Sequence, residues 1–394
     1  MNKPGTDPKP GNGASRGLPP TLPFARPFID EAMAAAVGET LLGRWIASGP
    51  QVAAFEKALS AYVGGRPVRV MTSATGAMQV ALEMLGVGPG DEVITPAQSF
   101  FATANMIEKV GATTVFVDVD LATRNLDFAQ ADAAVTPRTR VLLPTHYNAP
   151  IPPARLAQFR ARHGVRILED AALAIGSRVD GRPVGSEGDL VSFSFHPNKN
   201  MTTIEGGALV VNDAAEAAHV ERLRFHGIQR LADGTRDVVE AGGKFNLSDV
   251  SARLGLLQLA HLDAWCRRRT ELALRYFERL AGDDLLVPER LPPRDNPGHS
   301  WNMFTVLLPL AETRTTRKAV IDAMQREGIA LGMSYEAIHL TSLFRAKGFR
   351  EGQFPVSERI SRETVTLPLF VEMADSDVDR VCDTLRAVLR RKAA

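Results

Sequence analysis

The sequence predicts an α/β protein whose main sheet is mostly parallel. Two observations support this: seven short apolar, β-rich runs lie between residues 68 and 211, and amphipathic segments such as 77–85 and 154–164 separate several of them. This alternation is typical of βαβ units, in which helices cover both faces of the sheet. The seven runs are residues 68–72, 92–95, 113–120, 140–146, 165–170, 190–195 and 207–211. We therefore expect a mostly parallel, seven-stranded sheet in a large domain.

Composition divides the 394-residue chain into three parts. Residues 1–22 are rich in Pro, Gly and Lys with few apolar side chains, so we expect a disordered tail. Residues 23–265 contain the seven runs and form the predicted large domain. Residues 266–394 form a smaller predicted α+β domain, with a strand-like run at 304–310 and helical patterns near 316–327 and 375–391.

Charge, cysteines and hydropathy disfavour several classes of protein. Lys plus Arg number 46 and Asp plus Glu 45, so no net field attracts nucleic acid or an anionic membrane. Cys266 and Cys382 lie far apart without a CxxC pattern, which indicates a reducing compartment and no metal site. The first residues lack the apolar core of a signal peptide, and no run approaches the roughly 18 apolar residues of a membrane span. We expect a cytoplasmic protein with a small-molecule ligand.

Small polar residues follow the first predicted strand. Ligands of open α/β sheets bind beyond the carboxyl ends of the strands, and the run 68–72 leads directly into Ser73, Ala74 and Thr75 before a helical segment. Hydroxyl groups and free N–H groups at a helix start can bind a phosphate. A well-capped helix with no ligand explains the same residues.

A carboxylate and a lysine stand at two further strand ends. The run 165–170 ends in Glu169 and Asp170, and a carboxylate there can pair with a protonated pyridine nitrogen, although helix capping is an equal alternative. Lys199 lies in the turn between the last two runs. Most loop lysines are simply exposed, but apolar strands on both sides place this loop at the edge of the sheet.

An aromatic pair follows the second predicted strand. Phe100 or Phe101 could stack on a cofactor ring, and core packing is the alternative for one of the two. A phosphate cradle, a carboxylate for a ring nitrogen, an aromatic ring and a lysine together are the groups that pyridoxal phosphate (PLP) requires. The combination is more specific than any member.

These residues resemble the DegT/DnrJ/EryC1/StrS sugar aminotransferases, and the likeness runs from about Pro23 to near the C-terminus. Within that family the chain looks most similar to the bacterial enzymes that make UDP-4-amino-4-deoxy-L-arabinose for lipid A modification. The resemblance implies a fold type I PLP-dependent transferase. Six collinear segments carry it: 43–59, 73–96, 167–177, 193–207, 244–259 and 354–370.

The resemblance also implies roles for individual residues. Lys199 would form the Schiff base with PLP, Asp170 would pair with the pyridine nitrogen, and Phe100 would stack on the ring. Asn246 would reach the phosphate of the neighbouring subunit, which implies a homodimer with shared active sites, and His339 would lie on the substrate side. The expected phosphate ligands are Ser73, Ala74, Thr75 and Ser194.

Leu173 departs from the family pattern. Three positions after the aspartate the family usually has Gln or His, which donates to the phenolate oxygen of the cofactor. A leucine cannot donate, so the departure predicts altered cofactor electronics without removing the Schiff base.

The implied reaction is a ping-pong transfer of an amino group from L-glutamate to a nucleotide-linked keto-sugar, at C4 of the sugar. One alternative is a PLP-dependent sugar dehydratase of the same fold, but those relatives carry histidine where this chain has Lys199. Another is a non-catalytic sensor or regulatory relative, which Leu173 favours and the joint presence of Lys199 and Asp170 disfavours. A nicotinamide oxidoreductase is disfavoured because no G-x-G-x-x-G follows a predicted strand.

Overall fold

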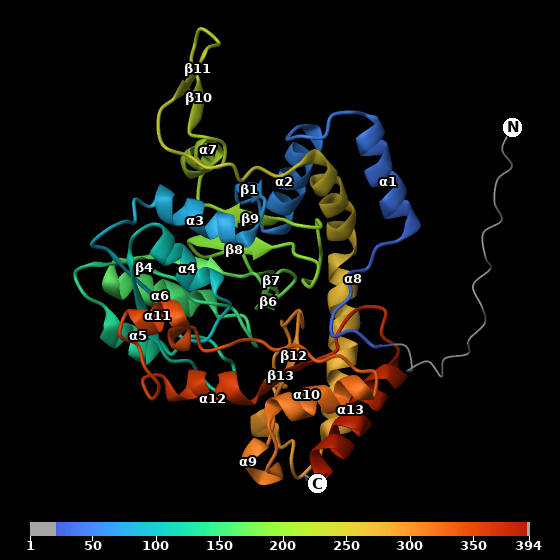
Figure 1. Cartoon of the computed structure of the whole chain (residues 1–394). Helices are drawn as coiled ribbons and strands as arrows, with labels where there is room; N and C mark the ends of the chain where they lie inside the picture. Colours follow the sequence, from blue (N-terminus) through green and yellow to red (C-terminus); the bar gives the residue numbers. More distant parts are fainter. Residues whose placement is uncertain (1–20, 392–394) are drawn as a thin grey trace, which may run out of the picture.

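A computed structural model describes residues 21–391, and this part of the chain has the predicted α/β architecture (Figure 1). Its main sheet has seven strands in the order β1-β9-β8-β5-β4-β2-β3, and within it β9 alone runs against the others. Every predicted run overlaps one strand, so the predicted sheet is confirmed. The strands are β1 (Val68–Met71), β2 (Glu92–Pro96), β3 (Thr113–Val117), β4 (Thr139–Leu142), β5 (Arg166–Asp170), β8 (Leu190–Ser194) and β9 (Gly207–Val210).

Helices cover both faces of this sheet because its strands are apolar on both sides. Leu168 of β5 packs with α3, α4 and α7 on one face, and its neighbour Ile167 packs with α5 and α6 on the other. Near β1, β8 and β9, α2 and α8 cover that second face. The helices are α2 (Pro50–Tyr62), α3 (Ala74–Met84), α4 (Ala102–Lys109), α5 (Phe128–Ala134), α6 (Pro153–His163), α7 (Ala214–Leu223) and α8 (Asp249–Leu280).

The C-terminal unit has a two-stranded antiparallel sheet, β12 (Phe304–Leu307) with β13 (Thr364–Leu367), and its own apolar core. Phe304 and Val365 from this sheet pack with Leu385 of the last helix. The predicted strand at 304–310 and both predicted helices are present, whereas β13 was not predicted. The helices of this unit are α9 (Leu310–Thr313), α10 (Arg317–Arg326), α11 (Ser342–Ala346), α12 (Pro355–Glu363) and α13 (Asp375–Arg390).

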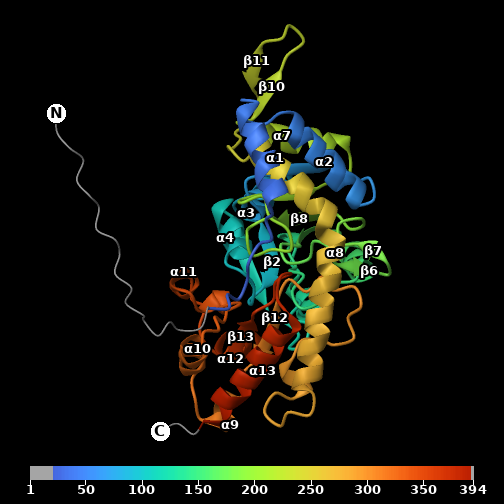
Figure 2. The ribbon, with the colours of Figure 1, turned by 90° about the vertical axis from the view of Figure 1, so that its right-hand side faces the viewer.

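Helix α8 joins the two units and crosses the boundary expected at residue 265. It is continuous over 32 residues. Leu262 and Cys266 pack in the core of the large unit, and Leu272 and Tyr276 pack in the core of the C-terminal unit. The two cores therefore divide along one helix and not at a linker, and Figures 1 and 2 show α8 spanning the height of the molecule.

The beginning of the described chain belongs to the C-terminal unit. The predicted tail, residues 1–22, lies outside the described residues except at its end. There, Leu22 accepts from Ala330 N at 2.9 Å and donates to Gly328 O at 2.8 Å, so the chain joins the fold before residue 23. Helix α1 (Glu31–Leu42) then packs against α8.

Two hairpins stand apart from these layers. The pair β10 (Ile228–Arg230) and β11 (Arg236–Val238) projects from the body in both ribbon views (Figures 1 and 2). The smaller pair is β6 (Arg178–Val179) with β7 (Arg182–Pro183). Across residues 21–391, no helix combines the length and the apolar character that a membrane span requires.

Candidate active site

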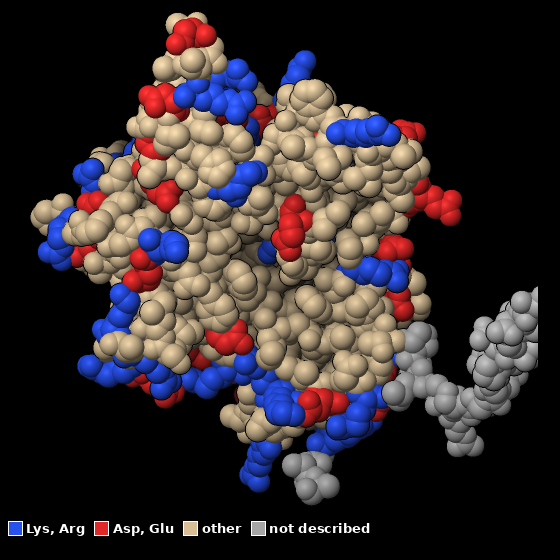
Figure 3. Space-filling model, turned by 45° about the horizontal axis from the view of Figure 1, so that its top comes forward, with Lys and Arg blue, Asp and Glu red and all other residues tan. Residues whose placement is uncertain are grey.

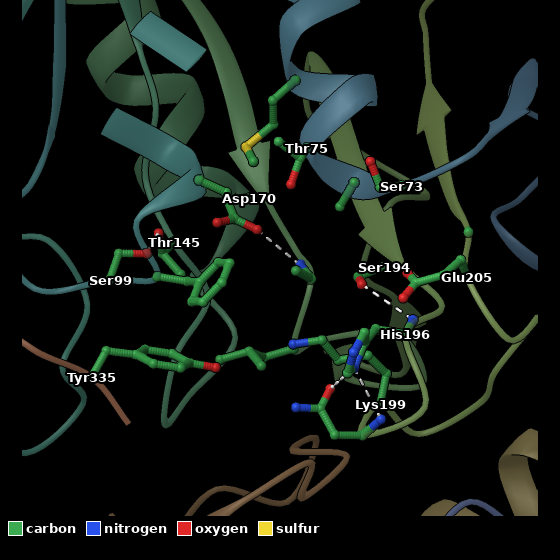
Figure 4. Close-up of a pocket in the computed structure, with 18 residues that line it drawn as sticks. Ser73, Thr75, Ser99, Thr145, Asp170, Ser194, His196, Lys199, Glu205 and Tyr335 are labelled. Atoms are coloured by element: carbon green, nitrogen blue, oxygen red, sulfur yellow. Dashed lines mark hydrogen bonds between the residues drawn. The ribbon is translucent and has the colours of Figure 1, made fainter. Parts of the chain in front are cut away.

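A cavity of about 260 Å³ opens where β5 and β8 end and α3 begins. Figure 3 shows a hollow in this face, with a basic residue at its floor and an acidic residue at its rim. Figure 4 shows the side chains that converge there: hydroxyls from α3, Asp170 on one side, and Ser194 and Glu205 on the other. Eight of the ten predicted site residues line this cavity: Ser73, Ala74, Thr75, Phe100, Asp170, Leu173, Ser194 and Lys199.

The start of α3 forms one wall of the cavity. Ser73 is the N-cap, and its Oγ accepts from Gly76 N at 3.0 Å. The first N–H groups of a helix have no acceptor within the helix, so they point outward at its positive end. A Cβ on Gly207 would lie 2.3 Å from Ala74 N, so glycine allows β9 to pack directly against this turn. The wall therefore presents hydroxyls and amides on a firm support.

Asp170 ends β5 and is 3% exposed. Its Oδ1 accepts from Ala172 N at 3.1 Å. Burial raises the pKa of Asp170, while the Ala172 N–H and the positive charge of Lys199 act in the opposite direction. A buried carboxylate of this kind gains most from a cation placed beside it in the cavity.

Lys199 lies in the loop between β8 and β9. Burial lowers the pKa of its ε-amine to about 8, although Asp170 raises it. The backbone of the loop is bonded on both sides of the lysine: Lys199 N donates to His196 O at 2.9 Å, and Thr203 N donates to Phe195 O at 3.0 Å. The lowered pKa makes the neutral, nucleophilic fraction of the amine near neutral pH much larger than that of an exposed lysine.

The structure separates the roles of the two adjacent phenylalanines. Phe100 is 52% exposed, lines the cavity and meets Tyr335 edge to face at 5.6 Å between ring centroids. Phe101 packs against a small core that includes Phe116. Leu173 lines the cavity with 5% of its surface exposed, so this position presents only methyl groups.

Six polar lining residues were missed by the sequence analysis: Ser99, Thr145, His196, Asn198, Glu205 and Tyr335. Thr145 is the penultimate residue of the run 140–146, so the strand-end rule that found Asp170 could have found it too; its Oγ1 lies 3.0 Å from Ser99 Oγ. Tyr335 has no comparable signal. It belongs to the C-terminal unit, and only the packing of that unit brings it to the cavity.

Two predicted residues do not line this cavity within the described chain. The Nδ2 of Asn246 donates to Ser48 Oγ at 2.6 Å at the edge of the large unit. His339 is fully buried, and its Nε2 lies 3.1 Å from Glu358 Oε1. The packing around His339 thus accounts for its burial without a substrate.

The sequence model of the DegT/DnrJ/EryC1/StrS aminotransferase family matches residues 27–386. The chain belongs to this family. It is similar to a Streptococcus pneumoniae protein described as a sugar aminotransferase in its PMP form, with 29% identity, a TM-score of 0.87, and coverage of 94% of this chain and 100% of that one. TlmJ, an aminotransferase from Streptoalloteichus hindustanus, is 33% identical with a TM-score of 0.85, over 93% of this chain and 98% of its own. DesI, solved in the presence of its TDP-sugar product, is 31% identical with a TM-score of 0.83, over 94% of this chain and 93% of its own.

This PLP-dependent sugar aminotransferase has a cavity whose residues fit its cofactor. The hydroxyls of Ser73 and Thr75 and the α3 amides suit a phosphate. Asp170 suits the protonated pyridine nitrogen, Phe100 suits the ring face, and Lys199 suits the aldehyde carbon. Buried charge, aromatic surface and nucleophile are thus arranged around one space.

Proposed function

We propose that this aminotransferase moves an amino group from L-glutamate to the ketone of a nucleotide-linked sugar, at C4 of the sugar. The observation that carries the proposal is the presence of Lys199 and Asp170 in one cavity beside the hydroxyls and amides at the start of α3. DesI, which was solved with a TDP-sugar product, supports the nucleotide link by similarity.

The residues of this chain supply binding and proton transfer. PLP, when bound, supplies an electron-poor ring that carries the amino group between the two substrates. Lys199 Nζ, with a pKa of about 8, accepts a proton from Cα of the amino donor and later delivers one to the sugar carbon. Asp170 holds the positive charge of the ring nitrogen throughout. Because the two substrates react in the same cavity and the amino group is retained there between them, the first product leaves before the sugar binds, so the order is ping-pong.

We also propose that two copies of the chain share their active sites. Large apolar side chains are exposed at the end of α1 and on the projecting hairpin, where Leu42 is 82%, Trp45 63% and Val238 64% exposed. Surfaces of this kind mark contacts with other molecules. Asn246 lies outside the cavity of its own chain, as a residue serving the partner's phosphate would.

The first experiment follows each half-reaction separately. Holoenzyme and glutamate alone should yield one equivalent of 2-oxoglutarate, and addition of UDP- or TDP-linked 4-keto-sugars should then give an amino-sugar detectable by mass.

Borohydride should fix the cofactor on Lys199. Replacement Lys199→Ala should abolish turnover, whereas Lys318→Ala, at an 83% exposed side chain, should not change it. Labelling of a different lysine would contradict the assignment.

The same set of keto-sugar substrates distinguishes an aminotransferase from a PLP-dependent dehydratase. A dehydratase would instead eliminate a hydroxyl beside the ketone and release a deoxygenated keto-sugar, with the amino group of glutamate lost as ammonia. Formation of such a product in place of an amino-sugar would overturn the proposed reaction while leaving the cofactor site intact.

A second experiment tests the shared site. Subunits carrying Lys199→Ala are mixed with subunits carrying Asn246→Ala, each inactive or weakened alone. Heterodimers would contain some sites with both native residues, so partial activity should return. If subunits exchange and activity does not return, Asn246 does not act across the interface.

A further inference from the structure

The peptide units around Lys199 are held from a distant segment of the chain. Asn302 lies just before β12 and is 7% exposed. Its Nδ2 donates to Asn198 O at 3.1 Å and lies 3.3 Å from Asn200 Oδ1. One amide group thus contacts the residues immediately before and after the lysine.

Asn200 extends this network on the far side of the lysine. Its side chain is 3% exposed, and its Nδ2 donates to Ile175 O and to Ser300 O, both at 3.2 Å. The lysine loop is therefore tied to the segment that contains Ser300 and Asn302 at two neighbouring positions. Buried amide networks whose donors are all used have well-defined geometry, because every alternative arrangement leaves a polar group unpaired.

The segment that holds the loop is itself anchored to α8. Arg269 is 3% exposed, and its Nη1 donates to the backbone oxygens of Leu369, Trp301 and Asn302 at 2.8, 3.3 and 3.4 Å. Helix α8 therefore holds the backbone of Asn302, which fixes the position from which its side-chain amide reaches the lysine loop.

We propose that Asn302 is a positioning residue for Lys199: it holds the backbone carbonyl of Asn198 before the lysine and the side chain of Asn200 after it, and so sets how deeply the ε-amine enters the cavity. The inference rests on the proposed role of Lys199. It goes beyond that role because Asn302 acts through the loop without contact to the reacting atoms.

Removal of the Asn302 amide should let the loop relax toward solvent. The groups around the amine are Asp170 from β5, His196 and Glu205 from its own loop, and Tyr335 from the C-terminal unit, and the substitution changes none of them. Burial is the main cause of the lowered pKa of Lys199, so greater hydration should raise that pKa from about 8 toward its ordinary value.

The test uses Asn302→Leu, which keeps the side-chain volume and removes the donors. Lys199 is titrated in the cofactor-free full-length protein by the pH dependence of its acetylation, read by mass spectrometry. The midpoint should rise by about one unit or more in the variant. PLP should couple to the cofactor-free variant about tenfold more slowly, and kcat should fall about 10- to 100-fold with little change in the KM for glutamate.

The matched control is Asn125→Leu. Asn125 is 8% exposed, donates to Ala149 O at 2.9 Å and accepts from Tyr147 N at 2.9 Å, so the control also loses two side-chain hydrogen bonds, away from the lysine loop. Both variants should melt at similar temperatures, and only Asn302→Leu should change the Lys199 midpoint. Asn302→Ser, a smaller polar replacement, serves if the leucine variant does not fold, and it should shift the midpoint in the same direction.

An unchanged Lys199 midpoint and an unchanged coupling rate in a folded Asn302 variant would overturn the proposal and leave Asn302 a merely structural residue. Because the titration needs neither cofactor nor substrate, this failure is distinct from a failure of the proposed reaction.

Discussion

The two ends of the cofactor cavity are built in different ways. The end at α3 comes from one short segment, in which Ser73 caps the helix and the hydroxyls and amides follow within three residues. The end at Lys199 is an irregular loop, and it depends on Asn302, about a hundred residues later. The donors of the first end come from one local segment, with β9 packed against it, whereas the second end is held by side-chain hydrogen bonds from a distant segment.

This difference separates two tasks. A phosphate anchor needs donors in a fixed direction, and a helix start supplies them from its backbone. A lysine that must bind the cofactor, be released from it and transfer protons needs a defined position but also some freedom to move. Its loop is therefore outside regular secondary structure and is stabilised by contacts from other segments. Substitutions at the start of α3 should therefore weaken PLP binding, and substitutions in the residues that hold the Lys199 loop should lower turnover.

The largest expected effect comes from Asp170→Asn, which removes the charge between the two ends. A neutral amide cannot hold the ring nitrogen positive, so the glutamate half-reaction should slow about 100-fold or more, as for loss of one preorganised electrostatic contact. In the cofactor-free protein the Lys199 pKa should fall further below about 8, because the Asp170 charge raises it. Stopped-flow spectroscopy and pH-dependent labelling measure the two effects.

Glu169→Gln is its control. Glu169 is the neighbouring residue, and its Oε2 lies 2.8 Å from His146 Nε2 on the other side of the strand. Equal losses in the two variants would mean that the charge of Asp170 has no special role.

The next effect tests the remote support through Arg269→Met. This change leaves three buried carbonyl oxygens without their donor, so we expect a loss of about 2 kcal/mol in unfolding free energy. Arg268→Met removes the ion pairs of the partly exposed Arg268 with Glu271 and Asp375 and its single bond to a carbonyl, Met373 O at 2.8 Å, and should cost about 1 kcal/mol. Denaturant titration of both variants measures the difference, and equal losses would contradict the role given to Arg269.

A smaller effect tests the local end through Ser73→Ala. The helix loses its cap, which costs about 1 kcal/mol, and the cavity loses a hydroxyl. Thr316→Ala removes the cap of α10 in the C-terminal unit, where Thr316 Oγ1 accepts from Ala319 N at 3.1 Å. Both variants should lose similar stability, but only Ser73→Ala should weaken PLP binding in a fluorescence titration. Unchanged affinity would remove Ser73 from the phosphate site.

The smallest effect concerns Leu173→Gln. A donor to the phenolate oxygen stabilises its charge and competes with the imine proton, so the Schiff base of the variant should lose its proton at lower pH than that of the wild type. The shift should be roughly half a unit, since a net hydrogen bond contributes about 1 kcal/mol or less. Leu173→Met keeps the apolar character and should titrate like the wild type. An identical titration of the glutamine variant would mean that another donor already serves the oxygen.

The sequence predicts the large unit well because its signals are local. Apolar runs mark each strand, and the strand-end rule locates Ser73 and Asp170 from the order of residues alone. The loop lysine was recognised through its flanking strands. The resemblance supplied the remaining expectations, of which Phe100 and Leu173 line the cavity and His339 does not.

The sequence does not predict contacts between segments that are far apart along the chain. Tyr335 reaches the cavity only because the C-terminal unit packs there, and Asn302 has no strand-end or helix-start signal. The boundary expected at residue 265 illustrates the same limit, since α8 continues across it and only the packing shows that its two halves belong to different cores. Strand β13 is four residues long and has its partner β12 almost sixty residues away, so its pattern alone did not identify it.

Helix α8 also touches the lysine loop directly. A Cβ on Gly255 would lie 2.8 Å from Thr203 Cγ2, and Gln258 Oε1 accepts from Thr202 N at 3.1 Å. Arg269 lies three turns further along the same helix and donates to Asn302 O. Helix α8, roughly 48 Å long at 1.5 Å per residue, therefore contacts both the lysine loop and Asn302. A rod clamped in both cores resists hinge rotation between them. We therefore expect substrates to reach the open cavity without rotation of the C-terminal unit, and the spacing between Lys199 and the C-terminal wall should stay nearly constant through the catalytic cycle.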